Sequence, residues 1–242
     1  MDFVSGLFSN TIAIIVVHPI DVIKSRYQIE HSKSFNKITK DILYSNGIKG
    51  FYRGLTPNIG TYPIFWAIFF QAKQINFNIT ENIFLNKFTT SFIAGNIAST
   101  FTNPLFVLKT RFQVKNDSRL DIIKDLNKNK LSFLKGLYPT YLNNLKLGLQ
   151  FPLYDYFKNK TENVVFSSFT SKFICSSLFY PLDLIRVNQR NSNKKLTIYD
   201  ISNNIYKKNG IKGFYRGLFL YNSVSLINFT IMMTLMEFIK NK

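Results

Sequence analysis

Three short segments share one spacing of a proline and a base. Between them, two positions after the proline, stands an aspartate in the first and third segments and a phenylalanine in the second. The segments read Pro19-Ile-Asp-Val-Ile-Lys24, Pro104-Leu-Phe-Val-Leu-Lys109 and Pro181-Leu-Asp-Leu-Ile-Arg186. A proline inside a helix removes one backbone hydrogen bond and kinks the helix. Residues three apart share a helix face, so an acid and its base project together just past the kink. Three such helices around one axis would bring these charges together as a ring.

A second landmark follows each of these segments and indicates that the chain is a threefold repeat. Gly-Ile-Lys-Gly-Phe-Tyr-Arg-Gly-Leu occurs at 47–55 and identically at 210–218, with a degenerate copy, Leu-Ser-Phe-Leu-Lys-Gly-Leu, at 131–137. The prolines of the first landmark are 85 and 77 residues apart. Because two unrelated landmarks share one period, we expect repeats at 1–80, 81–161 and 162–242 within a single domain, 1–242.

Each repeat contains two mostly apolar segments that approach the ~20 residues needed to span hydrocarbon. The segments are 3–20, 56–72, 88–107, 138–157, 165–185 and 219–239. Their Ser, Thr and Asn content suits helices with one face on lipid and another on a water-filled cavity. We therefore expect an all-α membrane protein with six transmembrane helices in three pseudo-symmetric repeats.

The basic residues alternate with these segments in a regular way. Lys and Arg number seven in 24–53, eight in 109–135 and eight in 186–216, out of 31 in a chain with a formal net charge of +18. With six spans, all three stretches lie on one side, which is the charge bias typical of membrane proteins. The other reading is a basic helical-repeat protein that binds nucleic-acid phosphates. The apolar character of the segments around much of their circumference argues against it.

The residue inventory gives no support for catalysis. One cysteine, Cys175, excludes an intrachain disulfide, and with two histidines it cannot assemble an ordinary His/Cys metal site. No glycine-rich phosphate loop follows a strand, and no acid–base pair has an obvious partner. We expect no enzyme activity, no metal and no cofactor.

With these motifs the chain resembles the mitochondrial carrier family over essentially its whole length. The family hallmark is Pro-x-acid-x-x-base, repeated three times, as at 19–24, 104–109 and 181–186. The resemblance implies a monomeric, multi-pass carrier of the mitochondrial inner membrane, with a short matrix-side helix in each repeat. It also implies a small anionic substrate, contacts with cardiolipin and other membrane lipids, and no nucleic-acid partner.

The resemblance further implies a matrix-side gate built from the proline motifs and the glutamines that follow them. The expected members are Asp21, Lys24, Gln28, Lys109, Gln113, Asp183 and Arg186. The cyclic pattern of the family pairs Asp21 with Lys109 and Asp183 with Lys24. The base of the third motif would need an acid at position 106, which is phenylalanine, so we expect two ionic links and one unpaired cation.

The gate expected on the opposite, cytoplasmic side is more degenerate. Its members would be Asp155 and Lys158 in the second repeat and Glu237 and Lys240 in the third. The family pattern there is aromatic-acid-x-x-base, and the first repeat, with Lys73, Gln74 and Phe77, keeps no part of it. Asp155 with Lys240 is the one complete link expected there, and a gate with few links should open at lower cost.

The substrate class is inferred from segments that look like the family branch that moves folate, flavin, NAD and pyrimidine nucleotides. These are Arg53-Gly-Leu-Thr-Pro-Asn-Ile59, Trp66-Ala-Ile-Phe-Phe70 and Gly148-Leu-Gln-Phe-Pro-Leu-Tyr-Asp155. The expected substrate-binding residues are Thr61, Trp66, Asn143, Lys146, Ser225 and Asn228. An aromatic ring can stack on a base, and an isolated lysine in an apolar helix needs water or an anion.

Three alternatives stay open at this point. Trp66 can serve helix packing, and Lys146 can extend its ammonium group to the membrane interface. Val224 replaces an arginine that is common in this branch, which weakens the case for a triphosphate or dinucleotide substrate. A carrier for carboxylates or amino acids is the second candidate function.

The glycine motifs precede helix starts, where backbone N–H groups bind anions. In the family such places hold cardiolipin phosphates. The resemblance therefore implies lipid binding at Arg53, Gly54, Lys135, Gly136, Arg216 and Gly217.

Overall fold

The computed structural model describes residues 3–75, 81–192 and 196–240, and side chains within 11–75, 81–192, 196–228 and 231. Within these ranges the chain is helical and contains no strand. The first repeat comprises α1 (Phe3–Ile29), α2 (Phe35–Asn46), η1 (Ile48–Tyr52) and α3 (Leu55–Gln74). The second comprises α4 (Ile83–Val114), α5 (Arg119–Lys128), η2 (Lys130–Leu134), α6 (Leu137–Asn143) and α7 (Leu145–Thr161). The third comprises α8 (Val164–Asn191), α9 (Ile198–Asn209), η3 (Ile211–Tyr215) and α10 (Leu218–Lys240).

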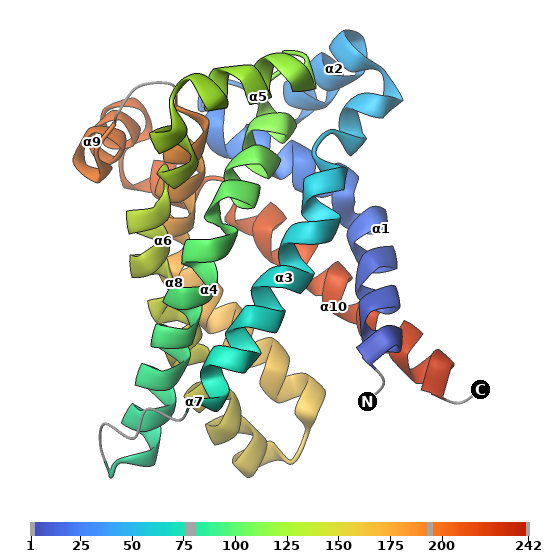
Figure 1. The fold of residues 1–242 in the computed structure, drawn as a ribbon, viewed down its shortest axis with the longest axis vertical. Coiled ribbons are helices and arrows are strands. Elements are labelled where there is room, and N and C mark those ends of the chain that lie inside the picture. The colour runs from blue at the N-terminus through green and yellow to red at the C-terminus, as the bar shows by residue number, and fades with distance from the viewer. Residues whose placement is uncertain (1–2, 76–80, 193–195, 241–242) are drawn as a thin grey trace.

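The long helices form a closed ring. Each of α1, α3, α4, α7, α8 and α10 contacts the next along the chain, and α10 packs back against α1. In Figure 1 the short helices α2, α5 and α9 all lie at the upper end, which we call the short-helix end. The opposite end, where α7 turns into α8, is called the far end. All three repeats therefore have the same orientation, as the three-repeat prediction requires.

The expected fourth long helix, 138–157, has a one-residue irregularity at Asn144, where α6 meets α7. The helical pattern continues through it, because Asn144 N–H donates to Thr140 O at 2.9 Å and Gly148 N–H donates to Asn144 O at 3.1 Å. The side chain of Asn144 donates hydrogen bonds to Asn96 Oδ1 (2.8 Å) and Ser99 Oγ (3.0 Å) on α4. These bonds hold this helix against α4, since a buried amide needs such partners.

Each short helix packs on the long helix that precedes it. A serine or threonine caps its first turn: Ser34, Ser118 and Thr197. Two aliphatic residues four positions apart then lie on one face and are buried against the preceding helix. The pairs are Ile38 and Ile42 on α2, Ile122 and Leu126 on α5, and Ile201 and Ile205 on α9.

The glycine motifs bring the starts of α3, α6 and α10 against the next repeat. Gly54, Gly136 and Gly217 have φ values of 81°, 77° and 86°, a region that side chains disfavour. A Cβ at Gly54 would lie 3.1 Å from the carbonyl oxygen of Lys109 on α4. The close approach and the positive φ explain why glycine stands at these helix starts.

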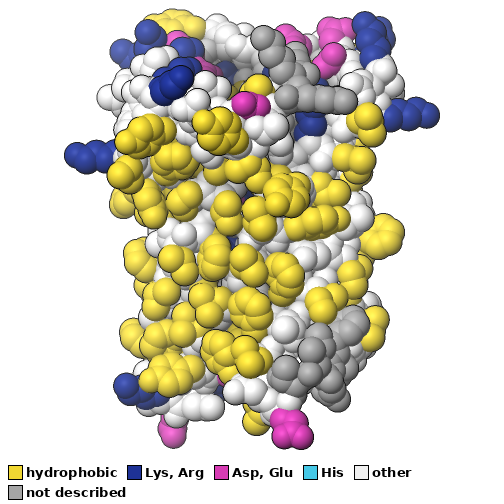
Figure 2. All heavy atoms as spheres, turned by 90° about the vertical axis from the view of Figure 1, so that its left-hand side faces the viewer, with side chains coloured by type: hydrophobic (Ala, Val, Ile, Leu, Met, Phe, Trp, Pro, Cys, Tyr) yellow, Lys and Arg dark blue, Asp and Glu magenta, His cyan; other side chains and the backbone are white. Residues whose placement is uncertain are grey.

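The outer surface carries many large apolar side chains. Figure 2 shows them as a broad band across one flank, with Lys and Arg gathered toward the short-helix end. Phe101 on α4, Phe173 and Leu178 on α8 and Phe219 on α10 are among those exposed. By hydropathy and charge content, none of the described helices qualifies as a membrane span.

The glycine geometry yields a matched pair of substitutions in α3 and its cap. Gly54→Ala forces a side chain into a left-handed conformation and against α4, and should destabilise the fold by roughly 1–3 kcal/mol. Gly60→Ala is the control, because a Cβ there meets nothing within 4 Å. Thermal unfolding in detergent, followed by a dye that reacts with buried Cys175 as it becomes exposed, measures both. Equal melting temperatures for the two variants would contradict this account of Gly54.

Candidate functional site

The first buried carboxylate of the ring belongs to Asp21 on α1. Lys24 pairs with it from the next helical turn, and Lys109 Nζ reaches it from α4 at 3.0 Å. Gln113 Nε2 donates to the same carboxylate at 2.8 Å, and Gln113 Oε1 accepts a hydrogen bond from Ser25 Oγ at 2.9 Å. The expected contact of Asp21 with Lys109 is therefore present, and Gln113 braces it.

The second buried carboxylate belongs to Asp183 on α8, and its partners differ from those expected. Arg186 pairs with one oxygen, and Lys146 Nζ from α7 lies 3.1 Å from the other. Asn143 Nδ2 on α6 donates at 3.1 Å. The expected link to Lys24 is absent among the described ion pairs, since Lys24 turns to Asp21 of its own helix. The expectation of an unpaired Arg186 is likewise wrong.

Tyr221 on α10 explains part of this rearrangement. Its hydroxyl accepts a hydrogen bond from Lys146 Nζ at 2.9 Å, and its ring lies 5.4 Å from Lys24 Nζ. Tyr221 thus contacts both Lys146, which pairs with Asp183, and Lys24, which was the expected partner of Asp183.

Phe106 replaces the third acid with an aromatic contact. Its ring meets Tyr62 edge-on at 5.6 Å and Phe65 at 6.2 Å, both on α3. The Arg190 guanidinium lies 5.0 Å from the Phe106 ring centre. At this junction the contact between repeats is apolar and cation–π in character.

Gln28 lies apart from both carboxylates. Its Nε2 donates to the Tyr180 hydroxyl at 3.0 Å, and that hydroxyl donates to the carbonyl oxygen of Arg216. Asn188 Nδ2 on α8 donates to the carbonyl oxygen of Gln28 at 3.2 Å. Gln28 therefore connects α1, α8 and the third glycine motif.

The residues expected at the substrate site do not all converge. Asn143 and Lys146 meet at Asp183, as described. Thr61 is fully buried and donates to the carbonyl oxygen of Pro57 in its own helix. Trp66 packs among Phe65, Phe69 and Phe70. Ser225 and Asn228 are half-buried on α10.

At the far end, Asp155 pairs with a residue that sequence reasoning missed. Lys87 Nζ on α4 lies 2.5 Å from Asp155 Oδ2, and both side chains are well exposed. Lys158 lies over the Tyr154 ring at 5.9 Å. The side chains of Glu237 and Lys240 lie outside the described residues, so the expected link between Asp155 and Lys240 stays a prediction.

The bases of the glycine motifs bind carbonyl groups at the ends of other long helices. Arg53 donates to Phe112 O on α4 at 3.1 Å, and Lys135 donates to Ser192 O, just after α8, at 2.8 Å. Arg216 donates to Tyr27 O on α1 at 2.9 Å. The three bases thus connect repeat one to two, two to three, and three to one.

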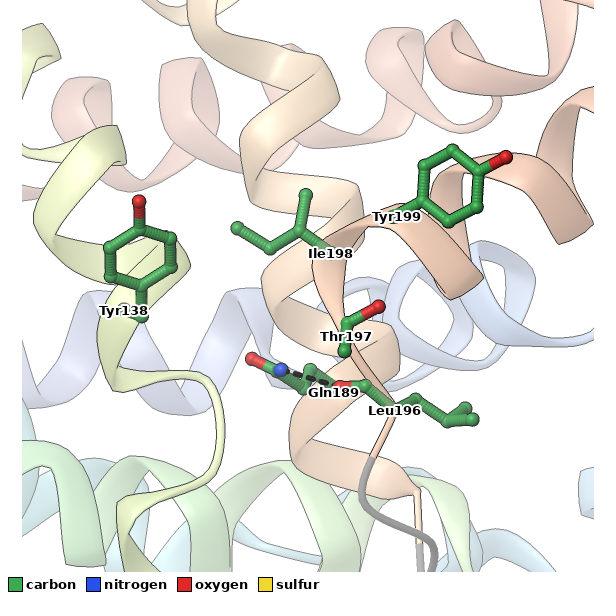
Figure 3. Close-up of a pocket in the computed structure, with 6 residues that line it drawn as sticks. All are labelled: Tyr138, Gln189, Leu196, Thr197, Ile198 and Tyr199. Atoms are coloured by element: carbon green, nitrogen blue, oxygen red, sulfur yellow. Dashed lines mark hydrogen bonds between the residues drawn. The ribbon is translucent and has the colours of Figure 1, made fainter.

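A pocket of about 440 Å³ lies beside the second glycine motif. Figure 3 shows Tyr138 of α6 across the pocket from Gln189 of α8, from Thr197, which caps α9, and from Ile198, the first residue of α9. At this helix start the Thr197 backbone N–H and hydroxyl hold the pKa of the Asp200 carboxyl below its usual range. The Asp200 carboxylate thus occupies the N-terminus of α9, and lipid binding at the glycine motif stays a prediction. Groups of His, Cys, Asp and Glu able to hold a metal are absent from the described residues.

A family model described as "Mitochondrial carrier protein" matches residues 1–76, 80–164 and 159–242, one match for each repeat. The chain belongs to the mitochondrial carrier family. Members of this family are transporters, so the recognition drawn from the proline and glycine motifs is confirmed.

Among the relatives of this carrier, mitochondrial substrate carrier family protein M of Dictyostelium discoideum is 29% identical, over 98% of this chain and 93% of the relative. The mitochondrial nicotinamide adenine dinucleotide transporter 1 of Saccharomyces cerevisiae is 24% identical, over 88% and 69%. The chloroplastic nicotinamide adenine dinucleotide transporter 1 of Arabidopsis thaliana is 26% identical, over 88% and 82%.

The burial of Asp183 and the exposure of Asp155 predict a large difference between two conservative substitutions. Asp183→Asn leaves Lys146 and Arg186 without a counter-charge and should destabilise the fold by about 3–5 kcal/mol. Asp155→Asn removes an exposed pair and should change stability by about 0–1 kcal/mol. Thermal unfolding of both variants in detergent tests this. Comparable melting temperatures would show that Asp183 is not the buried anchor described here.

Proposed function

We propose that this protein moves a phosphorylated nucleotide or nucleotide-like cofactor across the mitochondrial inner membrane by alternating access. The observation that carries the proposal is the pair of buried carboxylates at the short-helix end, each held by cations from a neighbouring helix. Asp21 joins α1 to α4, and Asp183 joins α8 to α7. These links close one end of the ring and can break without unfolding any helix.

Family membership and the outer surface support the membrane location. Exposed apolar side chains occur on the ring helices, including Val16, Ile64, Phe101 and Leu178. The basic stretches lie together at the short-helix end, which we assign to the matrix side. The name of the yeast relative includes the mitochondrion, which is the location proposed for this chain.

Lys146 connects the expected substrate site to the expected gate. Its ammonium group holds Asp183, and it lies beside Asn143 on the same carboxylate. Among described atoms, the amide oxygens of Asn143 and Asn228 are buried without a hydrogen-bond partner. Buried acceptors of this kind are normally satisfied, so they offer contacts to a bound molecule.

Alternating access then follows from competition for one cation. An anionic substrate that binds Lys146 competes with Asp183 for its ammonium group, which weakens the ion pair at the closed end. A ligand shifts such an equilibrium only by its difference in affinity for the two states. At the far end the exposed pair of Asp155 and Lys87 is weak, so closure there needs the contribution of bound substrate. Lipid phosphates at the glycine motifs and a monomeric state complete the proposal.

Uptake into liposomes tests the proposal. Purified protein is reconstituted, and uptake of labelled NAD, AMP, ADP, malate and an amino acid is measured with and without internal substrate. We expect saturable uptake of one nucleotide class. Lys146→Gln should reduce it about ten- to a hundredfold, the effect of losing a charged hydrogen bond.

Lys160→Gln is the matched control, since Lys160 is exposed near the end of the same helix. Uptake of malate or the amino acid without any nucleotide would overturn the substrate class and leave transport standing. If correctly inserted protein moves none of the five compounds, this proposed function is wrong.

A further inference from the structure

Lys172 is an isolated lysine inside a long helix, like Lys146. It lies on α8 between Ser171 and Phe173 and is half-buried. The described residues give its ammonium group neither an ion pair nor a hydrogen bond. An unpaired cation at such a depth is unfavourable unless it meets water or an anion, and it indicates a functional site.

The helix geometry directs Lys172 into the ring. Asp183 follows it by eleven residues, which is three turns plus about 20°, so the two share one face of α8. Cys175 and Asp183 on this face are buried, whereas Ile174, on the opposite side from Lys172, is exposed. Lys172 therefore projects inward, about 16 Å along the helix from Asp183 toward the far end.

Lys146 brings a second positive charge to this region. It reaches across from α7, which packs against α8, to the Asp183 carboxylate on the inward face of α8. Arg186 already shares Asp183 with Lys146, so that carboxylate cannot neutralise Lys172 as well. Lys172 therefore has no carboxylate of its own on this face, and an anion between it and Lys146 would be attracted by both ammonium groups.

We propose that Lys172 and Lys146 together form a binding site for the phosphate groups of the substrate, on the facing surfaces of α8 and α7. Lysine ammonium groups bind phosphate as point charges. Two of them fit a ligand with at least two negative charges, such as a diphosphate, better than a monocarboxylate. This inference deepens the proposed function and rests on it for the identity of the transported nucleotide.

The site also gives Lys172 a role in gating. Lys146 cannot contact Asp183 fully while it binds a phosphate that Lys172 holds on the other side. A diphosphate at Lys172 therefore competes directly with Asp183 for Lys146. Binding at the centre of the ring is thereby connected to the link that closes the short-helix end.

Chemical restoration of the charge tests the role of Lys172. Cys175 is the one cysteine of the chain, so a Cys175→Ser background allows a single thiol to be placed by Lys172→Cys. Uptake of NAD or ADP should fall about ten- to a hundredfold in this variant. Aminoethyl methanethiosulfonate adds an ammonium group through a disulfide and should restore uptake to within a few-fold of the background. The sulfonatoethyl reagent, which adds a negative charge, should not.

Lys160→Cys in the same background is the control, and neither reagent should alter its uptake. Restoration by both reagents, or by neither when labelling is complete, would show that the charge of Lys172 does not bind substrate. Unchanged uptake in the unlabelled Lys172→Cys variant would overturn the proposal directly.

A second measurement separates this inference from the proposed function. Inorganic pyrophosphate should raise the melting temperature of the unmodified protein, and Lys172→Gln should abolish the rise. If no nucleotide is transported but this difference is seen, the anion site stands and the nucleotide assignment fails. If pyrophosphate stabilises both proteins equally, or neither, the site at Lys172 is wrong whatever the protein transports.

Discussion

Taking Asp21 and Asp183 out of water is unfavourable unless each carboxylate is surrounded by cations and hydrogen-bond donors. The ring of helices supplies them from different repeats: Lys109 from α4 for Asp21, and Lys146 from α7 for Asp183. Each carboxylate therefore holds two helices together where it lies. Because ion pairs can exchange partners, the proposed alternating access opens the ring at the same contacts that join these helices.

The glycine motifs solve a different problem, which is how three repeats are joined in a ring. The last carbonyl groups of a helix lack partners within it. Arg53, Lys135 and Arg216 donate to carbonyl groups at the ends of α4, α8 and α1, each in the next repeat. The glycine that follows each base has no side chain, so its backbone can lie close to the helix of the next repeat. These contacts depend on backbone geometry, so they keep the threefold symmetry although the side-chain network does not.

The symmetry fails where the proposed chemistry lies. Phe106 puts an aromatic ring in place of an acid, and Lys146 takes the place that symmetry assigns to Lys24. Departures from a repeated pattern are expected at functional sites, where local order is exchanged for specificity. The excess of cations that results, with Lys172 added, is what makes the interior suited to an anion.

The sequence by itself determined the three repeats, the helical content, the family and the pairing of Asp21 with Lys109. Each of these follows from a pattern repeated in register, and repetition reports backbone structure and symmetric contacts. Only the tertiary structure decided the partners of Asp183, the contacts of Asn144 with α4 and the packing of Trp66 among other aromatic rings. The isolation of Lys172 was visible in the sequence, by the same signal that marked Lys146, but its direction required the burial pattern of α8. Where the three repeats differ, the contacts depend on how far individual side chains extend between helices. A repeated sequence pattern carries no information about such contacts.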